Sequence, residues 1–410
     1  MKILFINKYD ISGGAAIAAW RLHEQLVKVR NTDDRFVVGI KRSASEKVVS
    51  TRKPGLENKI EKGVNLVLNQ LGLQYKWFPF STRKIIKYAR EFNPDIISLH
   101  NIHGGYFETA LIKKLSEIAP IVWTLHDMWA FTANAAHTFG DESWRQMKPG
   151  KKERKLFPSI GLPLGKKLLK DKKKIYQQSN LTVVTPSKWL FSLASQSPLL
   201  KGKKVVQIYN GIDLNKFKLS DKAKAKKQLG LDPSLKVISF SAEKLMDSEH
   251  KGGKLLMEVL HLLDKAEQSI CILTIGGGHI QHDFKHIQIR EMGYITDEAQ
   301  YIQCLQASDL YIHPTKADTL PNTLIEAIAC GIPCITFDVG GCTEIIQNNE
   351  NGFVIERGNA SVFAKSIQYL SGDKDLYLEF SQNARKIAQK KFDVQTMAEQ
   401  YFALFESLTQ

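Results

Sequence analysis

Two carboxylates around the start of a helix form the strongest chemical signal in the sequence. Asp318 and Glu326 lie eight residues apart, and Pro321 between them favours a helix over 321–329. The spacing therefore predicts Asp318 on the loop before the helix and Glu326 just over one turn inside it. Carboxylates placed in this way can accept hydrogen bonds from paired hydroxyl groups of a sugar, without acting as an acid and a base.

Two glycine-containing segments could hold an anion such as phosphate. Lys251-Gly252-Gly253 precedes a helical pattern over 254–263, so a point charge, backbone N–H groups and a positive helix end could act together. A solvated lysine in a turn is the alternative. Gly13-Gly14 follows an apolar strand and opens a helix, but it lacks the GxGxxG spacing of dinucleotide sites. A plain tight turn also explains that pair.

A histidine and an aspartate follow a third apolar run. His126-Asp127 comes directly after residues 121–125, which we expect to form a buried strand. Polar groups at the carboxyl end of a parallel strand face the ligand in doubly wound folds. His126 could therefore hydrogen-bond a sugar hydroxyl or neutralise developing charge, although a histidine satisfied within the core is the commoner case.

The elements that must position these residues form two successive series of apolar runs and helical patterns. The runs cover 2–7, 35–41, 95–100, 121–126, 181–185 and 205–209, then 237–241, 269–275, 310–313, 333–337 and 352–355. Strands that alternate with helices predict parallel sheets. We therefore expect two doubly wound α/β domains, 1–212 and 213–392, with a ligand at the carboxyl ends of their strands.

Charge divides the chain at the same point. Residues 1–212 hold 36 Lys and Arg against 16 Asp and Glu, a formal charge of +20, whereas residues 213–410 carry −5. The densest basic stretch, Lys148–Lys174, has eleven basic and two acidic residues interleaved with apolar ones. Such a segment suits an anionic membrane surface or an anionic ligand, while a solvated basic helix is the alternative. No nucleic-acid-binding signature accompanies it.

Composition excludes several other classes of protein. The 410 residues are 43% hydrophobic and 24% charged, as in globular proteins. No apolar run reaches the ~18 residues of a membrane-spanning helix, and Met1 leads into an apolar strand without a cleavage pattern, so we expect a cytoplasmic protein. The five cysteines include no CxxC pair, which favours buried thiols over zinc ligands or disulfides.

Taken together, the motifs resemble those of the retaining glycosyltransferases of family four. The resemblance spans nearly the whole chain, and its most specific part is an acid followed eight residues later by Glu326 and then by Ala-Ile-Ala-Cys-Gly-Ile-Pro. The other matching pieces occur in the family's order: Gly13-Gly14, Thr124–Phe131, Pro186-Ser187, Asn210–Asp213, Lys251-Gly252, Gly340–Ile346 and Asn351-Gly352. The string His-Asp-Met-Trp-Ala-Phe-Thr is similar to the branch that makes bacterial capsule, exopolysaccharide or O-antigen.

The resemblance implies the GT-B fold, in which two Rossmann-like domains face a cleft and a C-terminal helix, here 393–410, crosses back to the first domain. It also implies a donor site. Glu326 would bind the ribose hydroxyls of a nucleotide-sugar, Asp318 would hold the transferred sugar, and Lys251 would bind the diphosphate as the leaving group. Backbone groups facing the donor would come from Leu320, Pro321, Asn322 and Thr323, and those near the base from Gly293 and Tyr294.

On the acceptor side, the resemblance implies that His126 touches the transferred sugar near its reacting carbon. Gly13, Gly14 and Asp127 would form the acceptor and phosphate loop. Three features depart from the family pattern. Asp318 replaces the usual glutamate, which leaves the donor sugar open. No arginine occurs in residues 241–251 ahead of Lys251, so Lys244 could substitute for it. Residues 132–137 lack the glycines and cysteines of similar proteins, which leaves details of the acceptor side open.

The function implied is transfer of a sugar from a UDP- or GDP-sugar to a saccharide or polyprenyl-diphosphate-linked acceptor, with retention of anomeric configuration. The acceptor would arrive at the inner face of the cell membrane, where Lys148–Lys174 could make peripheral contact. No cofactor or metal is expected, and Asp373-Lys-Asp375 matches a metal-binding pattern only by chance. A nucleotide-sugar epimerase on the same fold, or a nucleotide-sugar-binding protein that has lost catalysis, remains the alternative.

Overall fold

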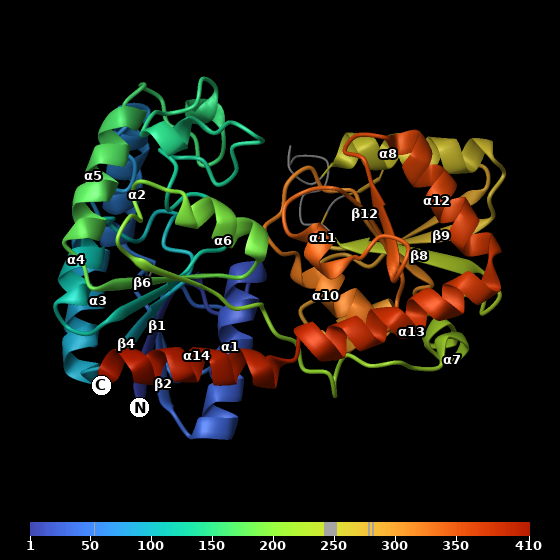
Figure 1. Cartoon of the computed structure of the whole chain (residues 1–410), viewed down its shortest axis with the longest axis horizontal. Helices are drawn as coiled ribbons and strands as arrows, with labels where there is room; N and C mark the ends of the chain where they lie inside the picture. The colour runs from blue at the N-terminus through green and yellow to red at the C-terminus, as the bar shows by residue number, and fades with distance from the viewer. Residues whose placement is uncertain (53, 242–251, 278, 281–282) are drawn as a thin grey trace. The chain divides into compact units, whose positions relative to one another are not determined.

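The computed structural model describes residues 1–410 except 53, 242–251, 278 and 281–282. The chain divides into two compact units, Met1–Gly211 with Val394–Gln410, and Ile212–Asp393. The predicted domain limits lie within one residue of these divisions. Each unit is built around its own parallel sheet flanked by helices (Figure 1).

Apolar β-branched and aromatic runs form the first sheet, whose strands are all parallel in the order β3-β2-β1-β4-β5-β6-β7. The second and the last strand, β2 and β7, begin two residues and one residue before their predicted starts. The polar residues there are included because pairing with the neighbouring strand, and not apolarity, sets where a strand begins. The strands are β1 (Lys2–Tyr9), β2 (Asp33–Ile40), β3 (Val48–Ser50), β4 (Ile96–Leu99), β5 (Ile121–Thr124), β6 (Leu181–Thr185) and β7 (Lys204–Gln207).

Both faces of the first sheet are buried, which explains why its strands read as unbroken apolar runs. Ile3 and Phe5 of β1 point into a cluster with α1 (Gly14–Arg30) and α14 (Val394–Thr409). Leu4 and Ile6 point into a second cluster on the opposite face. The helices of that side are α3 (Pro79–Phe92), α4 (Leu111–Ser116), α5 (Gly165–Gln177) and α6 (Lys188–Ser195).

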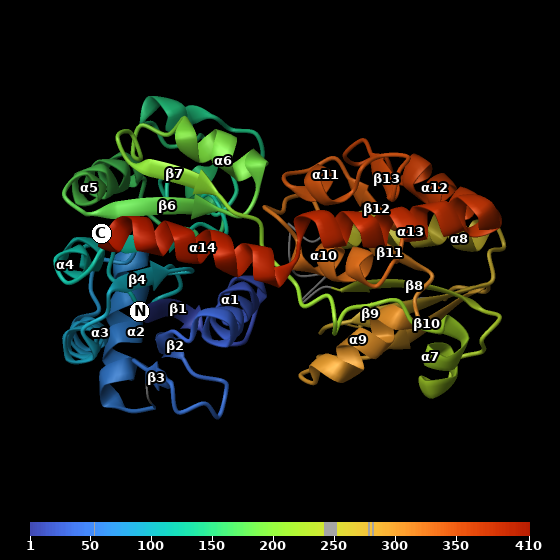
Figure 2. The same cartoon turned by 60° about the horizontal axis from the view of Figure 1, so that its bottom comes forward.

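The last helix, α14, belongs to the first unit, as predicted. It lies beside α1 on one face of the sheet (Figure 2) and buries Met397, Tyr401 and Phe405 there. The Tyr401 hydroxyl also lies 2.8 Å from Thr124 Oγ1 at the end of β5. The first unit further contains α2 (Leu56–Gln70) beside α3 and two short 3-10 helices, η1 (Ser143–Gln146) and η2 (Glu153–Lys155).

The second unit repeats the architecture with a parallel sheet in the order β10-β9-β8-β11-β12-β13. Its strands are β8 (Lys236–Ser241), β9 (Ile270–Ile275), β10 (Ile287–Glu291), β11 (Leu310–His313), β12 (Cys334–Phe337) and β13 (Gly352–Ile355). Its helices are α7 (Lys222–Gln228), α8 (Gly253–Lys265), α9 (Glu298–Gln306), α10 (Asn322–Ala329), α11 (Cys342–Ile345), α12 (Ala360–Gly372) and α13 (Lys374–Lys391).

The strand order of each sheet reverses direction once, between β1 and β4 in the first unit and between β8 and β11 in the second. Loops diverge at such a reversal, so the carboxyl ends of the strands there are where doubly wound folds bind ligands. His100 directly follows β4, and Asp318 lies on the loop that follows β11. Both residues are therefore at the edges where a ligand is expected.

Candidate active site

His126 lies at the carboxyl edge of the first sheet, directly opposite His100. Nδ1 of His100 is 3.0 Å from Nε2 of His126, and Nε2 of His100 is 3.2 Å from Oγ of Ser98. Burial lowers the pKa of His126 to about 4 and holds the pKa of His100 well below its ordinary value. Both rings are therefore neutral near pH 7, and the three side chains form a continuous hydrogen-bonded chain.

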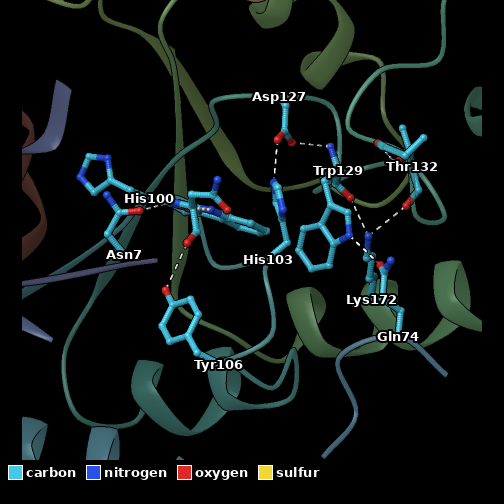
Figure 3. A network of polar contacts seen from close by, with 12 residues as sticks. Asn7, Gln74, His100, His103, Tyr106, Asp127, Trp129, Thr132 and Lys172 are labelled. Atoms are coloured by element: carbon cyan, nitrogen blue, oxygen red, sulfur yellow. Dashed lines mark hydrogen bonds and ion pairs between the residues drawn. The ribbon is translucent and has the colours of Figure 1, made fainter. Parts of the chain in front are cut away.

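Asp127 is held by a third histidine, His103. Its Oδ2 lies 2.6 Å from Nε2 of His103, and its Oδ1 accepts a hydrogen bond of 2.8 Å from the backbone N–H of Trp129 (Figure 3). Burial alone would raise the pKa of Asp127, but the imidazole of His103, then His137 and the Trp129 N–H, outweigh it and lower the pKa. Asp127 is therefore ionised and fixed beside His126.

Asn7 joins these residues to the start of α1. Its Oδ1 accepts from the backbone N–H groups of Lys8 and Asn101, at 2.8 and 3.1 Å, and its Nδ2 donates to the carbonyl of Ala15. Gly13 precedes α1 with φ of +85°, a conformation that favours glycine. The predicted Gly13-Gly14 loop thus lies at the same carboxyl edge as His126 and Asp127.

A small hollow opens beside these groups and is lined by polar and aromatic side chains. The lining residues are His100, Asn101, Ile102, His103, Trp123, Leu125, His126, Asp127, Trp129 and Ala130. Three imidazoles, one carboxylate and two indole rings therefore lie around it at the carboxyl edge of the first sheet.

Lys172 of α5 supports this arrangement from below. Its Nζ donates to the carbonyl oxygens of Trp129 and Thr132, at 2.6 and 3.1 Å, and lies 3.7 Å from the centre of the Trp129 ring (Figure 3). Glu153 is also buried and accepts from the backbone N–H groups of Ala133 and Asn134. The two charged side chains together fix the loop that follows Asp127.

In the second unit, Glu326 lies inside α10, as predicted, and is only 4% exposed. The hydroxyl of Tyr301, from α9, donates a 2.6 Å hydrogen bond to its Oε2. The neighbouring Tyr311 hydroxyl accepts from the backbone N–H of Ser241 at the end of β8. A buried carboxylate that accepts a short hydrogen bond from a half-buried phenol is in a defined orientation, which is what recognition of paired hydroxyls requires.

Asp318 lies on the loop between β11 and α10. Its Oδ2 is 3.6 Å from Nε2 of His313, and its carbonyl oxygen accepts from the N–H of Gly341 at 3.4 Å. The N-cap of α10 is Pro321, preceded by the buried Leu320, and the first turn contains Asn322 and Thr323. The predicted residues of this segment are thus together on one loop and helix start.

Two further predicted segments lie at the same edge of the second sheet. Gly293 follows β10, and its carbonyl accepts from the N–H of Gly276 at the end of β9, while Tyr294 beside it is exposed. Gly252, with φ of +75°, packs against the carbonyl of Pro314, which brings the start of α8 to the Asp318 loop. Lys244 and Lys251 lie outside the described residues.

Sequence comparison places the chain among known proteins. The model of the family described as Glycosyltransferase Family 4 matches residues 12–216, and that of Glycosyl transferases group 1 matches residues 221–387. The first of these covers half of the chain. The chain belongs to glycosyltransferase family 4.

Curated relatives of this family 4 glycosyltransferase are distant in sequence. N-acetyl-alpha-D-glucosaminyl L-malate synthase of Bacillus anthracis is 26% identical over 50% of this chain and 55% of its own length. WcaC of Escherichia coli, assigned to colanic acid biosynthesis as a glycosyl transferase, is 23% identical over 100% of both chains. The capsular polysaccharide biosynthesis glycosyltransferase CapM of Staphylococcus aureus is 25% identical over 48% of this chain and 53% of its own. The chain therefore spans about half the length of two of these three relatives.

The solved structures that resemble this glycosyltransferase share its fold. HepE of Anabaena, crystallised with UDP-glucose, superposes with a TM-score of 0.66 at 19% identity over 100% of both chains. WaaG, from lipopolysaccharide biosynthesis, superposes with a TM-score of 0.65 at 12% identity over 99% of both. The predicted fold of two Rossmann-like domains, GT-B, is confirmed.

The Asp373-Lys-Asp375 pattern of this glycosyltransferase has a structural explanation. Asp373 accepts a hydrogen bond from the N–H of Leu376 and caps α13, so the Asp373-Lys-Asp375 pattern begins with a helix cap. Across the described residues, no three His, Cys, Asp or Glu side chains group as metal ligands would. The five cysteines, all described, are buried and not joined by disulfides. In the described part of the chain, no helix has the length and apolarity to cross a membrane.

The basic segment Lys148–Lys174 is not the uniform surface that its composition suggested. Nine of its eleven basic residues are exposed, but Lys172 is buried under Trp129 and Asp171 forms an ion pair with Lys76 at 2.7 Å. The reason is that α5 packs its inner face against the sheet and the loop after Asp127, so every third or fourth residue faces inward. His100, His103 and Tyr301 were not predicted as site residues, and Lys172 was predicted only as part of the basic segment.

The contact between Gly340 and Asp318 yields a stability prediction. Gly340 has φ of +53°, and a Cβ there would collide with the carbonyl oxygen of Asp318. We expect Gly340→Ala to destabilise the second unit by about 2–4 kcal/mol, from the left-handed backbone plus the collision. Gly358→Ala is the matched control, because Gly358 has φ of +86° but open space around it, and it should cost about 1 kcal/mol. Urea unfolding followed by circular dichroism measures both, and equal losses would contradict the prediction.

The burial of Lys172 yields a pH prediction. Burial, opposed in part by Glu153 and Asp127, lowers the pKa of Lys172 to about 7, whereas an unfolded lysine titrates near 10.4. Between these two pH values Lys172 is protonated in the unfolded chain but largely neutral in the folded one. The free energy of unfolding of the first unit therefore rises with pH from about 7 to 10.

Tryptophan fluorescence can follow this unit selectively, since all six tryptophans belong to it. Urea unfolding at pH 7, 8 and 9 should give a gain approaching about 1.4 kcal/mol per pH unit from this group. The Lys172→Met variant should be less stable overall, because two carbonyls lose their donor, and its slope should be smaller by that amount. An identical slope in both proteins would contradict the prediction.

Proposed function

We propose that this glycosyltransferase moves a sugar from a nucleotide-diphosphate sugar to a hydroxyl of a saccharide or lipid-linked saccharide, with retention of anomeric configuration. The observation that carries the proposal is the buried Glu326 carboxylate, oriented by Tyr301 at the carboxyl edge of the second sheet. Asp318 lies on the loop that leads into the same helix. Together they offer two sets of acceptor oxygens to a ligand rich in hydroxyl groups.

The donor is bound by the second unit. Glu326 accepts from the ribose hydroxyls, Asp318 from the transferred sugar, and the first turn of α10 from Leu320 to Thr323 faces the diphosphate and sugar. Lys251, with Lys244 in support, neutralises the diphosphate as it leaves. Gly293 and Tyr294 meet the base. HepE binds UDP-glucose on the same fold, so a UDP-sugar is the first donor to test and a GDP-sugar the second.

The acceptor is bound by the first unit. His126 and Asp127, which line a small hollow at the carboxyl edge of the first sheet, offer an imidazole and a carboxylate to the acceptor, while Gly13 and Gly14 allow close approach of the backbone. His126 contacts the transferred sugar near its reacting carbon. The departing diphosphate accepts the proton of the acceptor hydroxyl, which arrives on the same face of the sugar, and the anomeric configuration is therefore retained.

We further propose that the reaction belongs to surface polysaccharide synthesis at the cell membrane. The product is a surface polysaccharide, as for the relatives whose names refer to colanic acid and capsule. The acceptor is linked to polyprenyl diphosphate, as in the name of a Campylobacter jejuni relative that acts on a diphospho-undecaprenol, 27% identical over 38% of this chain. The enzyme works at the cytoplasmic face of the membrane, which the exposed residues of Lys148–Lys174 contact, and it needs no metal or cofactor.

The test is transfer with defined donors. The protein is incubated with UDP-glucose, UDP-N-acetylglucosamine, GDP-mannose or ADP-glucose and a membrane extract or synthetic prenyl-diphosphate saccharide, with and without EDTA. Release of one nucleoside diphosphate, and a product whose anomeric configuration by NMR matches the donor, is the expected result. An inverted anomer would refute retention, and binding of a donor without transfer or hydrolysis would point to a protein that has lost catalysis.

A further inference from the structure

Helix α2 buries polar side chains and exposes apolar ones, the reverse of an ordinary surface helix. Its buried side chains are polar, Glu61 at 1% and Asn65 at 6% exposure, whereas Leu56, Leu66 and Val67 are 72%, 65% and 58% exposed. Amphipathic helices in globular proteins bury the apolar face. The inversion therefore needs a structural cause and leaves an apolar face without an explanation from folding.

The structural cause is that the polar face of α2 serves the next helix. Glu61 accepts from both the backbone N–H and the hydroxyl of Ser81, at 2.9 and 2.6 Å, in the first turn of α3. Asn65 donates to the carbonyls of Glu61 and Trp77, at 2.9 and 2.6 Å. These bonds satisfy the start of α3 and fix the orientation of α2, so its apolar side chains are held outward.

The exposed apolar side chains of α2 and of the segment bonded to its end make up what we call the α2 face. Leu56, Ile60, Val67 and Leu71 follow one another at steps of four, seven and four residues, the spacing of a single helix face. The segment after η2 extends it, since the N–H groups of Gly161 and Leu162 donate to the carbonyls of Asn69 and Gln70, both at 2.9 Å. The α2 face consists of Leu56, Ile60, Leu66, Val67, Leu71 and Leu162, which are 40–72% exposed.

Basic side chains lie beside the α2 face, on α2 itself and next to Leu162. Lys59 and Lys62 are exposed on α2 itself, and Arg154 lies beside Leu162, since its Nη1 donates to the carbonyl of Gly161 at 2.8 Å. The nearby carboxylate Glu57 is neutralised by Lys84, at 2.8 Å. Exposed lysines precede and follow Leu162 along the chain: Lys151, Lys152, Lys155, Lys166 and Lys167.

We propose that the α2 face docks on an anionic lipid bilayer. The apolar side chains enter the boundary between headgroups and acyl chains, and the surrounding lysines and Arg154 meet the lipid phosphates. An apolar stripe edged by basic residues on a helix that cannot span a bilayer is the pattern of an interfacial helix. The net charge of +20 in residues 1–212 favours a negatively charged partner over a neutral one.

The α2 face lies near the acceptor site, so docking would bring a lipid-linked acceptor to the enzyme. This step rests on the proposed function. Gln74, three residues after Leu71, accepts a 2.8 Å hydrogen bond from Nε1 of Trp129 and donates to the carbonyl of Pro158. Trp129 in turn donates its backbone N–H to Asp127. Gln74 and Trp129 thus connect the end of α2 to the acceptor hollow. A bilayer bound at the α2 face would therefore lie close to the acceptor hollow, where the saccharide of a prenyl-linked substrate has to bind.

Vesicle sedimentation tests the docking without using activity. The full-length protein is spun with vesicles of phosphatidylcholine alone or of phosphatidylcholine with 30% phosphatidylglycerol. We expect binding to the second and little to the first, weakened by raising salt. Ile60→Gln combined with Val67→Gln should lower the partition coefficient by about 100-fold. Lys59→Gln combined with Lys62→Gln should lower it less, and only on anionic vesicles.

The matched control is Val362→Gln combined with Leu378→Gln, which alters two exposed aliphatic side chains, 43% and 46% exposed, on α12 and α13 of the second unit. It should bind vesicles as the wild type does. Unchanged melting temperatures exclude misfolding, since every substituted side chain is exposed. Wild-type protein that ignores anionic vesicles, or an Ile60/Val67 variant that binds normally, would overturn the proposal.

Two further outcomes distinguish membrane docking from dimerisation through the α2 face and from failure of the proposed function. If the wild type is a dimer that the Ile60/Val67 variant dissolves into monomers, with no vesicle binding by either, the α2 face is an interface between copies and the proposal fails. Transfer to a water-soluble acceptor fragment should survive in the variant. If no transfer occurs in the wild type while vesicle binding holds, the proposed function fails and the docking surface stands.

Discussion

Replacing Glu326 with glutamine is expected to abolish most of the stabilisation that a bound nucleoside diphosphate gives to the protein. The wild-type carboxylate would accept charge-assisted hydrogen bonds from the ribose hydroxyls, each worth roughly 1.5–3 kcal/mol. Losing the charge should weaken binding about 100-fold. At a ligand concentration of 100 times the wild-type Kd, ligand stabilisation then falls from about 2.7 to about 0.4 kcal/mol.

Glutamine is the sharper substitution here because its amide oxygen can still accept from Tyr301, which donates to Glu326 at 2.6 Å. The fold of α10 should therefore survive. Thermal unfolding with UDP, GDP, ADP and CMP measures the effect and also identifies the base of the donor. Glu379→Gln, on the exposed side of α13, is the control and should retain the full shift. A Glu326→Gln protein that is stabilised like the wild type would remove Glu326 from the site.

Removing the His126 ring is expected to lower kcat by about 100-fold, the lower end of the range for a positioned imidazole at a reacting group. The structure adds that His126 does not act alone. Its Nε2 is engaged by His100, so Nδ1 is the nitrogen that can meet a sugar, and Ser98 fixes the other end of the chain. If Ser98 donates to His100, then His100 donates to His126 and Nδ1 of His126 carries a proton.

The consequence is a prediction for His100 as a positioning residue. His100→Ala should lower kcat by roughly tenfold with little change in donor KM, because His126 loses its fixed tautomer and orientation. It should also move the acidic limb of the pH profile upward from about pH 4 toward 6.5, since water entering the vacated space relieves the burial of His126. His261→Ala, on the exposed side of α8, is the control. A His100→Ala profile that coincides with the wild type would show that His100 only fills space.

The sequence predicted the fold well because both sheets are parallel and buried on both faces. Runs such as 3–6 and 121–123 are apolar throughout, and such runs can be recognised without knowledge of their neighbours. Pro321 and Gly252 mark helix starts through backbone chemistry that is equally local. Asp318 and Glu326 could therefore be placed on one loop and helix from spacing alone, and the structure places them there.

Residues that act by contact across the sheet could not be predicted in the same way. His100 meets His126, and His103 meets Asp127, over separations of 26 and 24 residues. Each pair forms only because β4 and β5 are neighbours and end at the same edge. Tyr301 reaches Glu326 from a different helix, α9, and a tyrosine in an amphipathic helix gives no local sign of such a partner.

By itself the sequence determined the two doubly wound units, the carboxyl-edge loops and the excess of positive charge in the first unit, because each follows from local patterns of apolarity, backbone preference and charge. Only the tertiary structure decided which side chains are paired and which face of a helix is buried. Lys172 lies within a basic run yet is buried under Trp129, and α2 turns its apolar residues outward because Glu61 and Asn65 satisfy α3. In both cases hydrogen bonds to distant backbone groups outweigh the hydrophobic pattern, and a linear pattern does not contain the identity of those distant groups.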